Sequence, residues 1–134
     1  MARSKSDRER KYTVATEDYL EAIRVVMDNN NSAEARVKDI ADEMGVKYPS
    51  VNNALQSLSK EKLINYRPYK NITLTTKGES LARRVLYKHK LLTCLLIEAL
   101  DCDEKLAEEN ACRIEHDLDD VVIKKLAKLR KQNR

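Results

Sequence analysis

The stretch from Glu34 to Leu58 constrains the fold most, because it holds two helical apolar stripes with a sharp break between them. Apolar residues recur at helical spacing in two sets, Val37, Ile40, Ala41 and Met44, then Val51, Ala54, Leu55 and Leu58. Gly45 is suited to end the first helix, and Pro49 to open the second. The sequence therefore predicts two helices joined by a tight turn.

The segments on either side extend this helix pair into a small domain. An earlier helix is predicted from an N-cap at Thr16 to about Asp28, with an apolar stripe formed by Leu20, Ile23 and Met27. Two short strands are predicted at 63–66 and 72–75, with residues 67–71 as the turn between them. Helix, turn, helix and hairpin follow one another in the order of a winged helix-turn-helix.

A second, helical part follows the hairpin. Thr76 and Glu79 have the spacing of a capping box, which predicts the start of a long helix over about 77–99. A last helix is expected over about 104–129. The fold class predicted is mainly α with a small β-hairpin wing. Its expected parts are a disordered basic arm (1–11), a winged helix-turn-helix domain (12–76) and a helical domain (77–134).

The composition agrees with a helix-rich protein that does not enter a membrane. Among 134 residues there are only 2 Gly and 2 Pro, and no Phe or Trp, so the core must be aliphatic with some Tyr. The longest apolar run, 91–97, is far shorter than the roughly 20 residues that a membrane helix needs. The first 11 residues lack the apolar stretch of a secretory signal. We therefore expect a cytoplasmic protein.

The cysteines and the charges point to different features. Cys94, Cys102 and Cys112 are odd in number and form no C-x-x-C pair, so we expect reduced thiols. Residues 47–90 carry ten Lys or Arg and two Glu, whereas 98–120 carry ten Asp or Glu and two basic residues. The basic block is a candidate nucleic-acid surface and the acidic block a candidate cation site. Alternatively, the two blocks are solvated helix faces of opposite sign.

The helix opened by Pro49 has the chemistry of a DNA-reading helix. Its outer face is polar and uncharged, and Asn and Gln can pair with adenine in the major groove. Basic residues before and after it can contact phosphates. The predicted DNA-binding residues are Arg36, Lys47, Tyr48, Pro49, Ser50, Asn52, Asn53, Gln56, Lys60, Arg67 and Lys70. The competing interpretation is an ordinary small domain with a polar helix face.

Two clusters of possible metal ligands lie near opposite ends of the chain. Cys112, Glu115 and His116 are spaced i, i+3 and i+4, which places them on one face of the predicted last helix. Asp18 and Glu21 are spaced i and i+3 on the first helix. Thiolate, carboxylate and imidazole together suit a divalent transition ion better than Ca²⁺ or Mg²⁺. A charged helix face that carries one Cys and one His is the alternative.

Together with His89 in Tyr87-Lys88-His89, these clusters around a winged helix resemble the diphtheria-toxin-repressor family of metal-dependent transcriptional repressors. The resemblance covers about Thr13 to Lys131, and the first helix is most similar to the short, manganese-responsive branch. It implies that residues 12–76 bind operator DNA, and that 77–134 bind metal and form a homodimer. The expected function is repression of metal-uptake genes.

The resemblance also implies a metal site where the first helix meets the last two. Its expected ligands are Asp18, Glu21, His89, Cys112, Glu115 and His116. The expected cofactor is Mn²⁺ or Fe²⁺, one or two per subunit. The chain is a hybrid, because the manganese branch has Glu where this chain has Cys112, and the iron branch has Met where it has Asp18.

Three other functions compete with this one. A metal buffer without a DNA role does not explain the basic winged segment, which leaves two. The closer one is a metal-independent winged-helix regulator that senses a small molecule or an oxidant through Cys112. The other is a metallo-hydrolase, which needs an open metal position and a general base. With only two His in the chain, no Ser/His or Cys/His dyad with an evident third member is present. We therefore expect no enzymatic activity and no small-molecule substrate.

Overall fold

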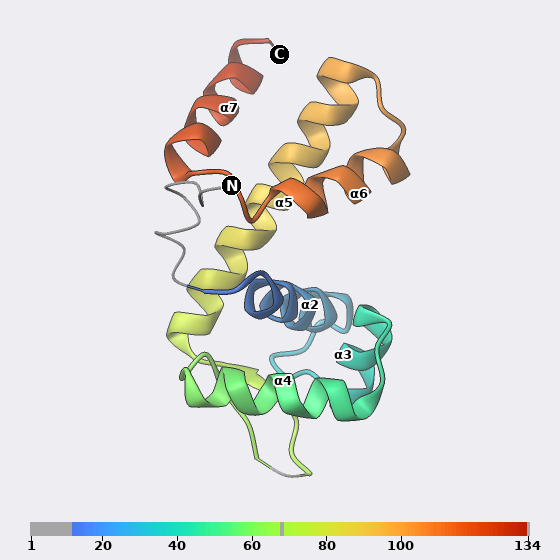
Figure 1. The fold of residues 1–134 in the computed structure, drawn as a ribbon, viewed down its shortest axis with the longest axis vertical. Coiled ribbons are helices and arrows are strands. Elements are labelled where there is room, and N and C mark those ends of the chain that lie inside the picture. The colour runs from blue at the N-terminus through green and yellow to red at the C-terminus, as the bar shows by residue number, and fades with distance from the viewer. Residues whose placement is uncertain (1–11, 68, 134) are drawn as a thin grey trace, which may run out of the picture. The chain divides into compact units, whose positions relative to one another are not determined.

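The computed structural model describes residues 12–67 and 69–133, and Figure 1 shows the course of the chain. The predicted arm at 1–11 lies outside the described residues. The elements are α2 (Val14–Asn29), α3 (Val37–Met44), α4 (Tyr48–Lys60), β1 (Ile64–Asn65), β2 (Thr73–Leu74), α5 (Thr76–Leu100), α6 (Glu104–Ile114) and α7 (Asp120–Gln132). Within the described ranges, no helix is long and apolar enough to cross a membrane. The mainly helical fold with a small hairpin is as predicted.

The contacts divide the chain into two units, which meet between Arg84 and Val85 inside α5. The predicted domain boundary lies after Thr76, at the start of this helix. Each unit has its own buried apolar cluster. We describe the two units separately, as Tyr12–Arg84 and the residues from Val85 onward.

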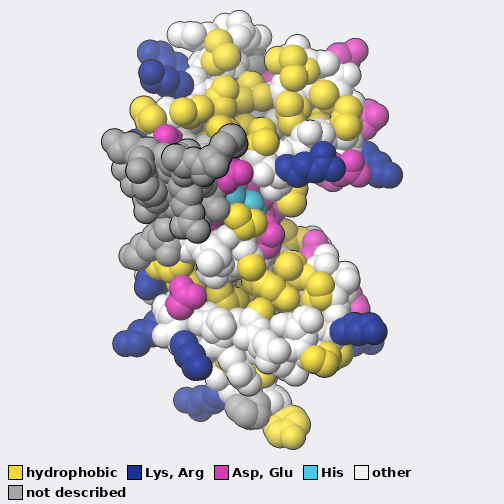
Figure 2. Space-filling model, viewed as in Figure 1, with side chains coloured by type: hydrophobic (Ala, Val, Ile, Leu, Met, Phe, Trp, Pro, Cys, Tyr) yellow, Lys and Arg dark blue, Asp and Glu magenta, His cyan; other side chains and the backbone are white. Residues whose placement is uncertain are grey.

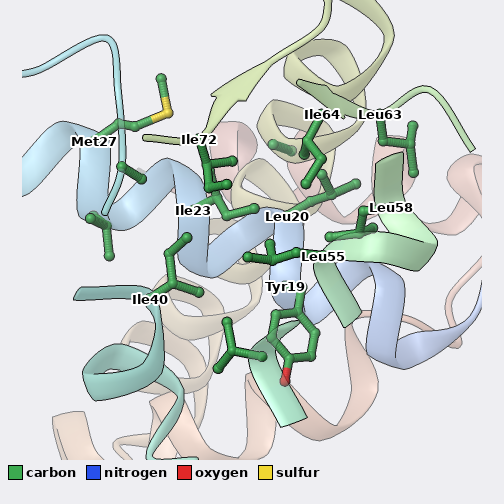
Figure 3. Close-up of a cluster of buried hydrophobic side chains, with 14 of the residues drawn as sticks. Tyr19, Leu20, Ile23, Met27, Ile40, Leu55, Leu58, Leu63, Ile64 and Ile72 are labelled. Carbon is green, nitrogen blue, oxygen red and sulfur yellow. The ribbon is translucent and has the colours of Figure 1, made fainter. Parts of the chain in front are cut away.

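The first unit is built around α2, α3 and α4. Its core residues come from all three helices and from the hairpin, and Figure 3 shows their side chains pointing toward one another. Leu20 and Ile23 of α2 and Leu55 of α4 are completely buried, as the apolar spacing predicted. Gly45 ends α3 with a left-handed φ of 67°, a conformation that glycine adopts without steric cost. The predicted helix-turn-helix is therefore confirmed.

The hairpin is also present, and it explains one error of the sequence analysis. β1 pairs with β2 in antiparallel register, Ile64 opposite Leu74. Ala35 forms a further isolated bridge with Ile72, in which the two residues exchange N–H to carbonyl bonds of 2.8 and 2.7 Å. These bonds hold Ala35 in extended backbone. For this reason α3 begins at Val37, whereas the sequence predicted a start near Glu34.

Two predicted helix caps are wrong in detail. Thr13, not Thr16, caps α2, because its hydroxyl oxygen accepts a bond of 3.1 Å from the Thr16 backbone N–H. At α5 the hydroxyl of Thr75, not Thr76, accepts from the Gly78 N–H at 3.0 Å. In both cases the sequence offered several Thr close together, and propensity alone did not identify the one that lies just before the helix.

The Glu79 carboxylate does not close a capping box. Instead it receives two bonds from Arg24 of α2, at 2.9 and 3.0 Å, and one from Arg83 at 2.6 Å. Burial alone would raise the pKa of Glu79, but the hydrogen bond from Arg83 and the charge of Arg24 outweigh it, so the pKa is lowered. The hydrogen bond to Asp28 is the main cause of a raised pKa of Arg24. This network ties α2 to the first turns of α5.

Gly78 is required by close backbone packing. A Cβ at this position would lie 1.9 Å from the carbonyl oxygen of Leu63, which itself accepts the Thr75 N–H at 3.1 Å. Gly78→Ala is therefore expected to lower the free energy of unfolding by about 2 kcal/mol, although Ala is the better helix former by about 1 kcal/mol. Urea unfolding would measure this, with the exposed Ser80→Ala of the same helix as control. A Gly78→Ala chain as stable as wild type would contradict the close approach.

The second unit contains the rest of α5 with α6 and α7. Leu91 and Leu92 of α5 pack with Ala111 of α6 and Ile123 of α7. Ion pairs join α5 to both ends of α7, Lys88 to Asp120 at 3.2 Å and Glu98 to Arg130 at 2.9 Å. The hydrogen bond from Arg130 to Glu98 raises the pKa of Arg130.

The prediction of a single last helix over 104–129 is wrong. The chain forms two helices, because α6 ends at Ile114 and α7 begins at Asp120. Asp119 is the N-cap residue of α7 and has extended backbone, with φ −66° and ψ 150°, but its side chain makes no capping hydrogen bond. The acidic residues between the two helices favour caps and turns over helix interiors. Glu115 and His116 therefore lie just beyond the end of α6, and not within a long helix.

Candidate functional site

Four of the predicted metal ligands meet inside the second unit. Nδ1 of His89, on α5, lies 2.7 Å from Oε2 of Glu115, which follows the last residue of α6. Nε2 of His116 lies 3.3 Å from the other carboxylate oxygen, Oε1. Cys112, one turn earlier on α6, places its Sγ within 4.8 Å of a Glu115 oxygen. One carboxylate, two imidazoles and a thiol thus converge.

The burial of Glu115 makes this cluster unusual. Glu115 is 1% exposed and His116 is 9% exposed, and they are the two polar or charged residues of the described chain that are buried. Among the described residues, Oε1 of Glu115 has no hydrogen-bond partner. Burying a carboxylate oxygen without a partner costs free energy, and such groups in folded proteins usually contact a bound water or ion or have a functional role. The nitrogen, oxygen and sulfur donors fit a divalent transition ion.

Asp18 and Glu21 occupy the first unit. Both lie on α2 and are partly buried, with i and i+3 spacing that puts them on one side of the helix. Tyr19 and Leu20, between them, face the core of this unit. The fold thus fixes which side of α2 presents the two carboxylates. Their predicted role as metal ligands stays a prediction.

The polar face of α4 is available to a partner. Lys47, Tyr48, Pro49, Ser50, Asn53, Gln56 and Lys60 are all exposed. Asn52 differs, because it is half-buried and its Oδ1 accepts a 3.3 Å hydrogen bond from the hydroxyl of Tyr66, beside the hairpin. Asn52 is among the predicted DNA-binding residues, whereas Tyr66 is not. This bond ties α4 to the hairpin.

Basic side chains surround the same end of the first unit. A hollow of about 560 Å³ lies at the base of the hairpin, lined among others by Lys62, Arg67 and Lys70. No acidic residue is among its lining residues. Figure 2 shows Lys and Arg side chains gathered where α4 and the hairpin lie. Lys62 was not among the predicted residues, although its place in the basic block could have pointed to it.

Arg36 is exposed, but its guanidinium is engaged within the protein. It bonds to Asp39 at 2.9 and 3.2 Å, and the bond to Asp39 raises the pKa of Arg36. A contact between Arg36 and a phosphate would therefore have to compete with Asp39. Arg67 and Lys70 lie on either side of the hairpin tip, where they are exposed.

The fold and these clusters define a winged-helix protein that combines a polar, basic surface at α4 and the hairpin with a buried cluster of possible metal ligands. Comparison with known proteins gives the same two parts. Residues 11–72 match the family described as "Iron dependent repressor, N-terminal DNA binding domain". Residues 75–133 match "Iron dependent repressor, metal binding and dimerisation domain". The chain belongs to this family of metal-dependent transcriptional repressors, the diphtheria-toxin-repressor family.

Individual relatives refine this assignment. The chain is 39% identical to the "uncharacterized HTH-type transcriptional regulator MJ0568" of Methanocaldococcus jannaschii, over 82% of this chain and 87% of the relative. It is 34% identical to the HTH-type transcriptional regulator MntR of Bacillus subtilis (strain 168), over 79% and 72%. The structure of the manganese regulator SloR matches with a TM-score of 0.76 and 29% identity, over 90% of this chain. This chain spans 55% of the SloR chain, about half its length. The matches to MntR and to the manganese regulator SloR support the manganese-type branch.

Proposed function

We propose that the protein is a homodimeric repressor that binds operator DNA when Mn²⁺ or Fe²⁺ is bound, and that it controls genes of metal uptake in the cytoplasm. The observation that carries this proposal is the buried Glu115 carboxylate, with an imidazole on each oxygen. The cluster lies in the part of the chain that matches a metal-binding and dimerisation domain, which supports a metal-binding role. We propose no catalytic role for the cluster.

We propose that His89, Cys112, Glu115 and His116 hold the ion together with Asp18 and Glu21 of α2. A bound divalent ion would supply the positive charge that this carboxylate-rich set lacks. Without that charge, the carboxylates repel one another or must take up protons, either of which costs free energy. Because His and Cys ligate only when deprotonated, metal affinity should fall as the pH falls.

In this proposal, Asp18 and Glu21 couple the ion to the DNA-binding unit. They lie on the helix whose other residues, Leu20 and Ile23, form the core under α4. Holding α2 therefore also holds the reading helix. In a homodimer this selects one separation of the two α4 helices, suited to half-sites one helical turn apart or a multiple of that.

Exposed apolar side chains on the second unit support the homodimer. Figure 2 shows a band of hydrophobic side chains across the unit that contains α6 and α7. Ile97, Leu100, Leu106, Ile114, Val121 and Val122 are all exposed. A large exposed apolar patch on a small protein commonly marks an interaction surface. We propose that a second copy of this chain covers it.

The test is DNA binding measured with and without metal. A duplex is first selected from a random-sequence library with the Mn²⁺-loaded protein. Its affinity is then measured with chelator and with Mn²⁺, Fe²⁺, Co²⁺ or Zn²⁺ at matched free concentrations. We expect Mn²⁺ or Fe²⁺ to tighten binding about 5- to 150-fold, the usual range of allosteric coupling. Equal affinity of the metal-free protein would instead favour a metal-independent regulator.

A further inference from the structure

We propose that the second unit binds a small aromatic anion in a hollow between α5 and α7. The ligand class is a single aromatic ring that carries a carboxylate, sulfonate or phosphate group. This inference involves neither the candidate metal ligands nor the first unit, so it stands independently of the proposed function.

The α5–α7 hollow lies within one unit and has room for a small ligand. Its volume is about 240 Å³, and its lining residues come from 87–94 of α5 and 127–131 of α7. An apolar protein cavity of about 150 Å³ can hold benzene, so this volume admits one ring with an anionic substituent. The exposed apolar residues assigned above to the homodimer do not line it, so the two are separate surfaces.

The charged side chains that line the hollow are all positive. Lys90 of α5 contributes one of them, and Arg130 and Lys131 of α7 contribute the others, whereas no acidic residue is among the described lining residues. Among the described residues, neither Lys90 nor Lys131 has an ion-pair partner. Two unpaired cations beside one hollow favour an anionic ligand, because each is close to the place that the ligand's charge would take.

The third cation, Arg130, is oriented by a neighbour but keeps donors for a ligand. Its Nε and Nη2 donate to the two carboxylate oxygens of Glu98, at 3.1 and 2.9 Å. These bonds use two of the five N–H groups of the guanidinium, so three remain. The pair with Glu98 therefore fixes the plane of the guanidinium, and its other N–H groups can donate charge-assisted hydrogen bonds to a ligand.

The uncharged lining residues favour a ring over a bare ion. Leu91 and Ala127 supply aliphatic surface, and Cys94 supplies a half-buried thiol. Tyr87 is 53% exposed, so its side chain is available to stack on an aromatic ligand. Small-molecule sites typically combine such apolar surface with a few polar groups that orient the ligand. An aromatic anion covers the apolar part and reaches the cations, whereas an inorganic ion uses the cations alone.

Calorimetry with three probes tests for the site. Benzenesulfonate has both the ring and the negative charge, benzenesulfonamide has the ring without the charge, and methanesulfonate has the charge without the ring. We expect benzenesulfonate to bind the full-length protein about tenfold more tightly than either of the other two. Each of those lacks either the apolar contact or the charge-assisted hydrogen bonds.

Matched variants test the contribution of the cations. Lys131→Gln is expected to weaken benzenesulfonate binding about fivefold, because it removes one of the two cations without an acidic partner. Lys124→Gln removes an exposed cation of α7 that does not line the hollow, and it should bind the probe like the wild type. Equal weakening by the two substitutions would show a general effect of net charge and would overturn the inference.

The thiol of Cys94 reports where the probe binds. Benzenesulfonate at about ten times its Kd should slow the alkylation of Cys94 by iodoacetamide about tenfold, because the thiol then reacts only in the unliganded fraction. Cys102, in the turn between α5 and α6, should react at an unchanged rate, and fragmentation mass spectrometry distinguishes the two thiols. The inference is overturned if benzenesulfonate does not bind, if methanesulfonate binds as tightly, or if Cys94 is not protected. None of these results changes the proposed function, because the assay measures neither DNA binding nor metal binding.

Discussion

Glu115→Gln is expected to weaken Mn²⁺ binding at least 100-fold while leaving the metal-free protein as stable as the wild type, or more so. The carboxylate is 1% exposed, and both of its oxygens lie close to an imidazole nitrogen. Gln keeps the size and one acceptor oxygen but removes the negative charge. Loss of a charged metal ligand costs more than the 10- to 100-fold typical of residues that only orient a ligand.

The metal-free protein should tolerate this change because Glu115 is poorly satisfied without a cation. Oε1 accepts no hydrogen bond from the described residues, so the wild type bears the cost of burying it. A buried carboxylate with an oxygen that lacks a partner carries a large desolvation cost, and a neutral amide of the same size carries a much smaller one. Glu115 thus lowers the stability of the metal-free protein and raises its affinity for the ion.

Thermal unfolding with and without Mn²⁺ would measure both effects. Metal at about 100 times its Kd should stabilise the wild type by about 2.7 kcal/mol, and Glu115→Gln by much less at the same concentration. Glu108→Gln, at an exposed acidic position of α6, is the matched control and should behave like the wild type. Equal stabilisation of both variants by Mn²⁺ would show that Glu115 does not hold the ion.

The sequence predicted the elements of the fold that depend on local periodicity and on special residues. The apolar stripes of α3 and α4, the turn at Gly45 and the helix start near Pro49 are all present. Helix ends were predicted less well, and one of these errors arose where a long-range bond decides. The bridge from Ala35 to Ile72 shortens α3 at its start, and no local pattern contains that information.

The site shows the same division. The spacing of Cys112, Glu115 and His116 singled out residues that the structure brings together, although the helix that was expected to carry them ends at Ile114. Nothing in the spacing shows that Glu115 is buried, because burial results from packing between distant segments. Tyr66 and Lys62 were missed for a similar reason: their relation to α4 and the hairpin depends on how the strands return.

Operator affinity is expected to fall by about 10³- to 10⁵-fold between 50 and 200 mM salt if the homodimer contacts 6 to 10 phosphates. The basic side chains that would contact these phosphates lie on α4 and the hairpin. Lys47, Lys60 and Arg67 are exposed, and the block from 47 to 90 holds ten basic residues against two Glu. Each phosphate contact releases condensed counterions, so the logarithm of the affinity falls linearly with the logarithm of the salt concentration.

The slope of that line tests individual residues. Arg67→Ala should reduce the slope by about one phosphate contact in each protomer, and therefore by about two in the dimer, with a similar loss for every duplex sequence. Lys124→Ala removes an exposed cation from α7, outside the basic block, and should leave the slope unchanged. Fluorescence anisotropy at fixed free Mn²⁺ would give both slopes. If wild-type affinity barely changed with salt, the basic block could not be the DNA-binding surface, because contacts to phosphates cannot form without releasing ions.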